Sequence, residues 1–251
     1  MLTAITRAVS PAISACELTF LDRSAIDYAR ADAQHRAYEE CLRALDVWVV
    51  SLPALADLPD SVFVEDPAVV LDEVAVIARP GAASRRPEAE LLAAALERFR
   101  PLARIEAPGT LEGGDVIRAG RELYVGLSRR TNAEGIAQLA AILEPYGYSV
   151  TAVEVRGCLH LKSGACYLGR GTLLANREWI DATAFTGHRI VDVAEGWAAD
   201  VLAIRDVILM PAGFPNTAER LEAAGFAVRT VDLSELQKAE AGVTCMSLIV
   251  G

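Results

Sequence analysis

One structural unit recurs along the chain, and this repeat restricts the possible folds more than any other sequence feature. Tight polar turns near residues 72, 120, 170 and 205 each join two short apolar stretches, a pattern typical of β-hairpins. Helical stretches that each lead into a further strand are predicted over 27–45, 87–99, 131–146, 176–181 and 217–224. The turns recur roughly every 35 to 50 residues, a period typical of repeat architectures.

The two ends of the chain complete the repeat only if they pair with each other. Residues 2–9 and 246–250 are apolar strands that lack a local hairpin partner. Their pairing would supply a fifth hairpin and close the units into a ring without exposed sheet edges between units. We favour this ring over the alternative, an open α/β sheet with antiparallel strands. Because no linker or low-complexity stretch divides residues 1–251, we expect a single domain.

Composition and charge indicate a globular protein that suits a cationic ligand. Apolar residues make up 53% of the chain and charged residues 23%, which excludes disordered and fibrous classes. The net charge of −10 disfavours nucleic acid and anionic membranes as partners, although acidity alone also keeps proteins soluble. No apolar run approaches the roughly 18 residues that a membrane span needs, so no membrane association is expected.

The cysteine pattern favours reduced thiols and a cytoplasmic location. The cysteines are odd in number and lack CxxC spacing, which argues against a disulfide framework or a structural zinc site. The first residues resemble a strand and lack the features of a signal peptide. GxGxxG, P-loop and HExxH motifs are absent, so no cofactor or metal is expected.

Chemically reactive side chains stand just before the predicted hairpins. In a closed ring these segments point toward the axis, so their side chains would converge. The segments are 60–66, 112–115, 160–163, 197–200 and 243–245. Cys245 is the candidate nucleophile and His160 the candidate general acid/base, because a thiol beside an imidazole supports covalent catalysis. Taken singly, either residue is more often part of an apolar core.

Carboxylates in the same segments predict a cation-binding site. Glu112 precedes two glycines, which either permit a close approach of backbone or ligand or simply form a turn. Glu65 and Asp66 form an acidic pair in apolar surroundings, and buried carboxylates need a positively charged partner. A cationic ligand would provide that partner. The equally open alternative is an ion pair with Arg85, Arg86 or Arg130.

Six segments of the chain resemble the dimethylarginine dimethylaminohydrolases, a family of guanidino-group-modifying enzymes. They are PDSVFVEDP (59–67), RPGAASRR (79–86), EAPGTLEGGD (106–115), RTNAEG (130–135), LHLKSG (159–164) and TCMS (244–247). The resemblance runs essentially end to end and implies a five-bladed α/β propeller, or pentein, closed by its terminal strands. It also implies a hydrolase without cofactors that converts a small cationic amino acid, an Nω-methylated arginine, to citrulline. A homodimer is compatible with it.

The same resemblance implies a role for each matching residue. Cys245 is the nucleophile, His160 the general acid/base, and Glu112 together with Asp66 binds the guanidinium group. The implied substrate-binding positions are Leu18 on a flap, Asp60, Glu65, Asp66, Arg85, Arg130 and the main-chain carbonyl near Ala239. Lys162 stands where arginine deiminases and amidinotransferases typically have aspartate, which favours a methylated guanidinium.

Two departures from the family pattern keep other functions open. Asp200 stands where asparagine is usual, and residues 239–242 replace an Asp-Gly-Gly-like segment. An arginine deiminase or another amidine hydrolase is the enzyme alternative. A catalytically silent propeller, like the related ribosome anti-association factors, is the non-enzyme alternative.

Overall fold

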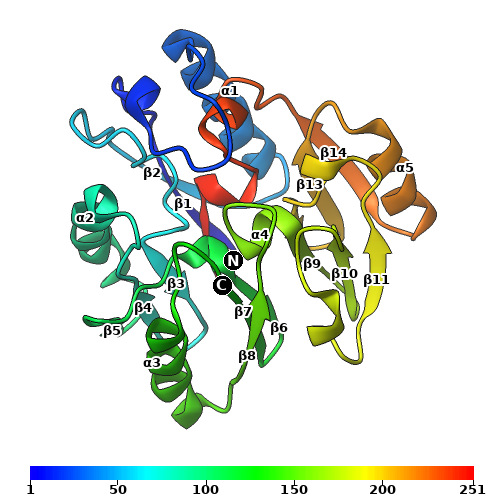
Figure 1. The fold of residues 1–251 in the computed structure, drawn as a ribbon. Coiled ribbons are helices and arrows are strands. Elements are labelled where there is room, and N and C mark those ends of the chain that lie inside the picture. The colour runs from blue at the N-terminus through cyan, green and yellow to red at the C-terminus, as the bar shows by residue number, and fades with distance from the viewer.

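Five three-stranded sheets of the same topology are arranged around a common centre (Figure 1). The computed structural model describes residues 1–251. In every sheet the first strand is antiparallel to the middle strand, and the third strand is parallel to it. The predicted five-bladed α/β propeller is confirmed. The sheets are β15 (Leu248–Val250), β1 (Thr3–Arg7) and β2 (Trp48–Leu52); β3 (Ala68–Val70), β4 (Ala75–Ile77) and β5 (Leu102–Arg104); β6 (Val116–Ala119), β7 (Glu122–Leu127) and β8 (Ser149–Glu154); β9 (Ala165–Gly169), β10 (Thr172–Ala175) and β11 (Arg189–Asp192); and β12 (Leu202–Ile204), β13 (Val207–Pro211) and β14 (Ala227–Val231).

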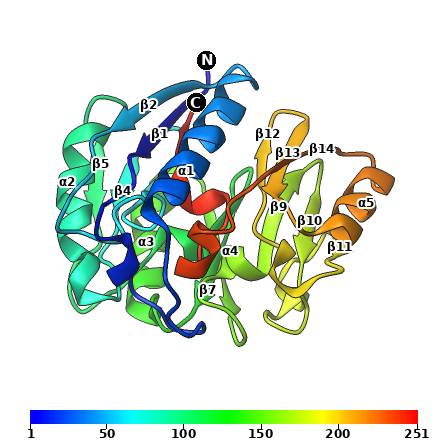
Figure 2. The ribbon, with the colours of Figure 1, turned by 90° about the horizontal axis from the view of Figure 1, so that it is seen from above.

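In four of the five units a helix connects the middle strand to the third strand on the outside of the ring (Figures 1 and 2). These helices are α1 (Tyr28–Arg43), α2 (Arg86–Leu96), α3 (Ala133–Leu143) and α5 (Pro215–Ala223). Side-chain caps fix two of their starts, because Asp27 accepts the amide of Arg30 and Asn132 accepts the amide of Gly135. None of the helices combines the length and the apolar character needed to cross a membrane.

The helix predicted over 176–181 is wrong. Ile180 instead forms a β-bridge with Val155, and the amide of Arg156 donates to the carbonyl of Trp179 at 2.7 Å. Backbone pairing with the preceding unit therefore competes successfully with the local helical preference. Only the short 3₁₀ turn Ala182–Ala184 follows in this unit.

Pairing between the first and last strands closes the ring. β1 and β15 are antiparallel, with Thr3 opposite Val250 and Ile5 opposite Leu248. The two termini accordingly lie side by side in both views (Figures 1 and 2). The predicted fifth hairpin is thus built from strands at opposite ends of the chain.

Five apolar cores lie between adjacent sheets, one at each junction of the ring. Successive side chains of a strand point to opposite faces, so each middle strand feeds two cores. Ala4 packs into the core shared with β12–β14, whereas Ile5 packs into the core shared with β3–β5. Leu123 and Tyr124 of β7 are divided between two cores in the same way. Both faces of the middle strands are therefore buried.

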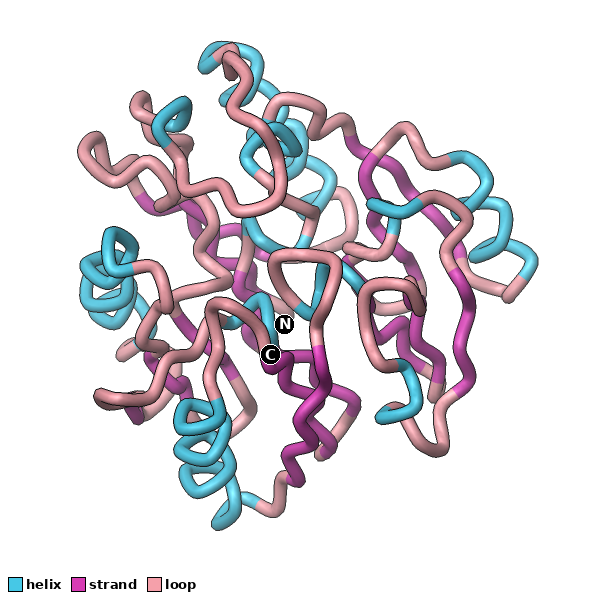
Figure 3. Tube along the Cα trace, viewed as in Figure 1, coloured by secondary structure: helices cyan, strands magenta, loops and turns pink.

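The segments that enter the first strands lie near the centre of the ring. Four of them are single helical turns, namely η3 (Gly113–Asp115), α4 (Leu161–Gly164), η6 (Gly196–Ala198) and η8 (Thr244–Met246). The first strands that they enter contact one another around the ring, as β6 contacts β9 and β9 contacts β12. Figure 3 shows the loops that gather around α4. The predicted convergence of these segments is confirmed.

Closure of the ring should contribute measurably to stability. Ile5 is fully buried between two sheets, so Ile5→Ala should lower the free energy of unfolding by about 2–5 kcal/mol in urea denaturation. Trp48→Ala is the matched control, because Trp48 lies in the same sheet but is 63% exposed. It should change the same quantity by less than about 1 kcal/mol. Equal losses in the two variants would contradict a closure that depends on Ile5.

Candidate active site

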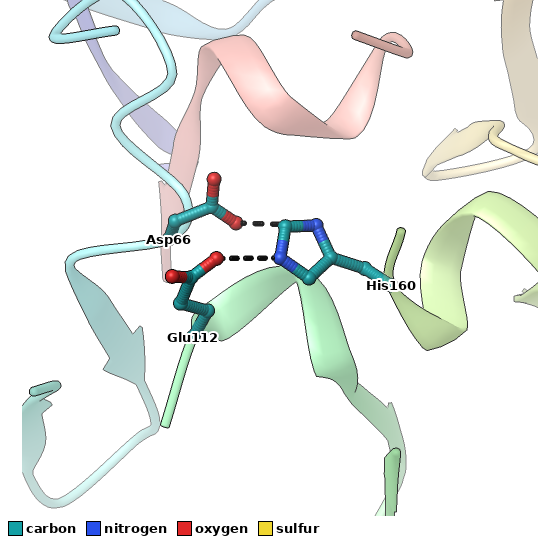
Figure 4. A group of neighbouring side chains, drawn as sticks. All are labelled: Asp66, Glu112 and His160. Atoms are coloured by element: carbon teal, nitrogen blue, oxygen red, sulfur yellow. Dashed lines mark hydrogen bonds and ion pairs between the residues drawn. The ribbon is translucent and has the colours of Figure 1, made fainter. Parts of the chain in front are cut away.

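A buried pair between His160 and Glu112 forms the centre of the site. Glu112 immediately precedes η3 and His160 immediately precedes α4, so neighbouring units deliver the two side chains. Nε2 of His160 lies 2.6 Å from Oε2 of Glu112. At the opposite side of the imidazole, Nδ1 of His160 lies 3.7 Å from Oδ1 of Asp66. Figure 4 shows both carboxylates directed at the imidazole.

The two carboxylates hold the imidazole in its charged form. Burial alone would lower the pKa of His160, but Asp66 and Glu112 outweigh this effect and raise that pKa to about 9. Burial would also raise the pKa of Glu112, yet the hydrogen bond and charge of His160 hold it well below its usual range. His160 is therefore an imidazolium at neutral pH and can act as a proton donor.

Close packing, rather than a turn, explains the two glycines after Glu112. Neither glycine has a positive φ. A Cβ at Gly114 would lie 2.6 Å from Nδ1 of His160 and 2.7 Å from Oδ1 of Asp66. The amide of Gly114 also donates to Oδ1 of Asp66 at 3.1 Å. Of the two explanations left open by the sequence, the close approach of other groups is the one that holds at Gly114.

Two arginines extend this charge network outward. Arg85 forms an ion pair with Asp66. Nη1 of Arg130 lies 3.3 Å from Oε1 of Glu112. Of the three arginines considered as partners of Glu65 and Asp66, only Arg85 pairs with one of these acids, whereas Glu65 pairs with Lys162 and Arg130 pairs with Glu112. Cations and anions alternate in the order Arg85, Asp66, His160, Glu112 and Arg130.

Asp115 fixes the segment that carries His160. Its Oδ1 accepts the amide of Leu161 at 2.9 Å, and its Oδ2 accepts the hydroxyls of Ser128 and Thr131, each at 2.7 Å. Burial raises the pKa of Asp115 to about 6, although the charge of His160 opposes the rise. The carboxylate of Asp115 therefore links η3, in which it lies, to the start of α4 and to the loop that contains Ser128 and Thr131.

Cys245 lines the same small cavity as His160 and does not face bulk water, since it is only 8% exposed. The amide of Gly242 donates to its Sγ at 3.4 Å. Burial, followed by the charges of Asp200 and Glu65, raises the pKa of the Cys245 thiol well above its usual value. The thiol is thus uncharged in the free protein, and a cation placed in the cavity would favour the thiolate.

Glu240 anchors a loop at the edge of this cavity. Its Oε1 accepts the amides of Thr19, Phe20 and Leu21 at 2.9, 2.5 and 2.7 Å. Successive amides that converge on one anion form an anion-binding nest. Glu240 adopts a left-handed φ of 60°, which is unusual for a residue other than glycine. The loop that holds Leu18 is therefore tied to the segment just before Cys245.

Most of the predicted site residues meet at the cavity. Its lining contains Asp60, Asp66, Arg85, Arg130, His160, Ala239 and Cys245. Glu112 contacts His160 from behind, and Leu18 is partly buried in the loop anchored by Glu240. The carboxylate of Glu65 does not line the cavity. It lies 2.6 Å from Nζ of Lys162 and accepts the hydroxyl of Thr244 at 2.7 Å.

Asp66, Glu112 and His160 are also close enough together to be considered as metal ligands, with ligand atoms within 4.8 Å of one another. The two carboxylates lie at opposite nitrogens of the imidazole, however, Glu112 at Nε2 and Asp66 at Nδ1, so they do not converge with one nitrogen on a single point as metal ligands do. The arrangement suits a planar organic cation that donates hydrogen bonds to both carboxylates.

Sequence reasoning assigned no role to three buried acids of the site, Glu88, Asp115 and Glu240. Oε2 of Glu88 lies 2.8 Å from Nη2 of Arg85. Glu88 follows Arg85 by three residues at the start of a helix, and this spacing could have indicated the ion pair between them. Glu240 lies five residues before Cys245 in a glycine-containing segment, which is a weaker signal. No feature of the sequence distinguishes the role of Asp115.

Comparison with known proteins gives a consistent group of relatives. Residues 50–156 match the family model described as arginine deiminase. The chain is 44% identical to the N(G),N(G)-dimethylarginine dimethylaminohydrolase of Pseudomonas aeruginosa, over 88% of this chain and 89% of that protein. It is 39% identical to the protein of the same name from Streptomyces coelicolor, over 98% and 95% of the two chains.

Solved structures show the same similarity. The Pseudomonas aeruginosa enzyme, as a Cys-to-Ser mutant complexed with citrulline, has a TM-score of 0.94 and 41% identity over 98% of both chains. A His-to-Gly dimethylarginine dimethylaminohydrolase adduct with S-methyl-L-thiocitrulline gives the same values. The N-terminal domain of ArgZ, a cyanobacterial arginine dihydrolase, has a TM-score of 0.86 at 22% identity, which shows similarity of fold alone.

The charge state of His160 can be tested by replacing its partner. Glu112→Gln removes the carboxylate that contacts Nε2, so it should lower the pKa of His160 by about one unit or more from its value near 9. An NMR pH titration of the imidazole protons measures this shift. Glu122→Gln, which removes the carboxylate 3.1 Å from Nε2 of His188, is the control and should leave His160 unchanged. A wild-type midpoint below about 7 would contradict the ion pair.

Proposed function

The chain belongs to the N(G),N(G)-dimethylarginine dimethylaminohydrolase family, and on this premise we propose that it hydrolyses Nω-methylated arginines to citrulline and a methylamine. One observation carries the proposal, namely that the buried His160–Glu112 pair stands beside the cavity lined by Cys245. The citrulline and S-methyl-L-thiocitrulline held by the solved relatives support an amino-acid substrate. Because catalysis by Cys245 requires a reduced thiol, we place the enzyme in a reducing compartment such as the cytoplasm.

Binding of the guanidinium group is the first step of the proposed reaction. Asp66 and Glu112 accept hydrogen bonds from this planar cation, and charge-assisted bonds of this kind are strong and directional. Both carboxylates are buried and held by Arg85 and Arg130, so little reorganisation is needed when the substrate arrives. The charge of the substrate also lowers the free energy of a nearby thiolate, so Cys245 releases its proton to solvent.

Formation of a covalent intermediate follows. Sγ of Cys245 attacks the guanidinium carbon, and a C–S bond forms. The imidazolium of His160 donates its proton to the departing dimethylamine or methylamine nitrogen, and the C–N bond breaks. The products of this half-reaction are a thiouronium on Cys245 and a neutral His160.

Hydrolysis of the thiouronium completes the cycle. Neutral His160 takes a proton from water, and the water oxygen attacks the thiouronium carbon. The C–S bond then breaks, the new hydroxyl passes its proton to the departing sulfur, and citrulline leaves with a ureido group. Cys245 returns as the neutral thiol and His160 as the imidazolium, and the steps use no metal or organic cofactor.

The remaining predicted residues are proposed to bind the amino-acid end of the substrate. Arg85 and Arg130 line the cavity and suit an α-carboxylate, because guanidinium groups bind carboxylates in bidentate fashion. Asp60 and the main-chain carbonyl of Ala239 suit an α-ammonium group. Leu18, on the loop anchored by Glu240, covers the bound substrate.

Lys162 supports a preference for methylated substrates. Its ammonium lies 2.6 Å from Oε1 of Glu65 and 3.1 Å from the carbonyl oxygen of Gly113. Lys162 is engaged by these two groups and does not line the cavity, so this position supplies no carboxylate there that would accept from an unsubstituted guanidinium nitrogen. We propose that Glu65 contributes to the site by holding Lys162 and the hydroxyl of Thr244.

An arginine deiminase is the competing function, because the matched family model carries that description. A substrate panel of arginine, monomethylarginine, asymmetric dimethylarginine and agmatine separates the two. We expect the methylated arginines to give ureido product faster than arginine and agmatine. Ammonia release from arginine that outpaces dimethylamine release would select the deiminase instead.

The nucleophile can be tested within the same panel. Cys245→Ser should reduce turnover by more than about 100-fold while the circular dichroism spectrum stays unchanged. Cys41→Ser is the matched control, because Cys41 lies in α1 outside the cavity, and it should remain active. Residual activity of Cys245→Ser above a few per cent would contradict the assignment.

The acid/base residue can be tested with a substrate whose leaving group needs no proton. His160→Gly should react with S-methyl-L-thiocitrulline, because a thiolate departs unaided, and should then fail to activate water. Intact-mass analysis should show a stable adduct on Cys245. The double variant His160→Gly/Cys245→Ser is the control and should stay unmodified. An unmodified single variant would count against the role of His160.

A further inference from the structure

Asp200 supports the backbone on both sides of the Cys245 thiol. It follows η6, and it is only 5% exposed. Its Oδ1 accepts the amide of Thr244, the residue before Cys245, at 2.9 Å. Its carboxyl group also packs directly against Gly242, where any Cβ would overlap it. Gly242 is the residue whose amide donates to Sγ of Cys245. A change in Asp200 is therefore transmitted to the nucleophile through two contacts.

A single hydroxyl group lies between two buried carboxyl groups at this point. Oγ1 of Thr244 is 2.7 Å from Oε2 of Glu65 and 3.2 Å from Oδ2 of Asp200. A hydroxyl has one proton and can donate to only one of these oxygens. The second contact is a hydrogen bond only if the carboxyl group itself carries a proton.

The position of Lys162 indicates which carboxyl group carries that proton. Nζ of Lys162 lies 2.6 Å from Oε1 of Glu65, so Glu65 remains a carboxylate. Oδ2 of Asp200 has no cation within ion-pairing distance. A proton on Asp200 satisfies the contact with Thr244 and leaves the buried cluster of Lys162, Glu65 and Asp200 without net charge, which avoids the cost of an unpaired buried charge.

We propose that Asp200 is a positioning residue that carries a proton in slightly acidic solution and loses it in slightly alkaline solution, and that loss of this proton opposes formation of the Cys245 thiolate. The inference rests on the proposed function, in which Cys245 is the nucleophile. A neutral Asp200 donates to Thr244 and leaves the thiolate as the only unpaired negative charge of this region. An ionised Asp200 places a second negative charge close to the Cys245 thiolate.

The surroundings of Asp200 agree with this assignment. Burial, together with the charge of Glu65, raises the pKa of Asp200 to about 7, against the opposing effects of Thr244 and Lys162. Asp200 also lines a cavity of about 260 Å³ beside Trp197 and Phe214, which gives the carboxyl group a route for proton exchange. The titratable groups that interact electrostatically with the Asp200 carboxyl group are Glu65, Lys162, Cys245, Cys166, Cys158 and Tyr38.

Asp200→Asn reproduces the protonated form permanently. The amide oxygen can accept from the amide of Thr244, and the amide nitrogen can donate to its hydroxyl. The measurement is the rate at which iodoacetamide alkylates Cys245 between pH 6 and pH 9, followed on the tryptic peptide 239–251. At pH 8, where Asp200 is ionised in the wild type, we expect alkylation of the variant to be about tenfold faster, equivalent to one unit of thiol pKa. At pH 6 the two rates should agree more closely.

Controls separate this role from a structural one. Asp206→Asn changes an exposed aspartate in the β12–β13 turn and should match the wild type at every pH. Asp200→Ser, a smaller neutral replacement, should shift the profile in the same direction and serves if Asp200→Asn does not fold. Parallel profiles for wild type and variant, or slower alkylation of the neutral variants at all pH values, would overturn the proposal. If the wild type does not turn over methylated arginines, the proposed function fails, whereas the alkylation profiles still decide the role of Asp200.

Discussion

Burial of both faces of the middle strands is the constraint on which the structure depends. A strand such as β1, with Ala4 in one core and Ile5 in another, cannot stand at the end of an open array, because one apolar face would be exposed to water. Each sheet must therefore have neighbours on both sides, and a closed ring is the arrangement that provides them. The ring brings the segments that enter the hairpins together at its centre. The apolar side chains of the strands fill the cores between the sheets, so the polar side chains of the site come from these entrance segments.

Two polar networks lie on either side of the Cys245 thiol at the centre of the ring. One is the alternating row from Arg85 to Arg130 that contains the imidazolium of His160, and the other joins Lys162, Glu65, Thr244 and Asp200. Buried ion pairs contribute little to stability after desolvation, and an apolar replacement often does as well. Their value here is chemical, because they fix donors and acceptors before the substrate arrives. The charge of the substrate then supplies what the free site lacks, a counterion for the thiolate.

Much of this could be predicted from the sequence, for identifiable reasons. Hairpin turns and apolar periodicity are local, so the five units, the closure by residues 2–9 and 246–250 and four outer helices follow from them. The helix over 176–181 fails because its backbone pairs with Val155, a contact between units that no local pattern encodes. The meeting of Cys245 and His160 followed from the ring, and the specific roles followed from resemblance. The partners of Glu65 and the nest around Glu240 depend on side-chain directions, which spacing does not determine.

The position of Cys245 immediately before β15 links reactivity to the completeness of the fold. Cys245 and His160 line one cavity in a ring that closes through pairing of β15 with β1, a strand from the opposite end of the chain. A partly folded molecule, with its ring still open, lacks this cavity, and its Cys245 thiol loses the burial that raises its pKa in the closed ring. The candidate site therefore belongs to the closed chain as a whole, and damage that releases either terminal strand dismantles it.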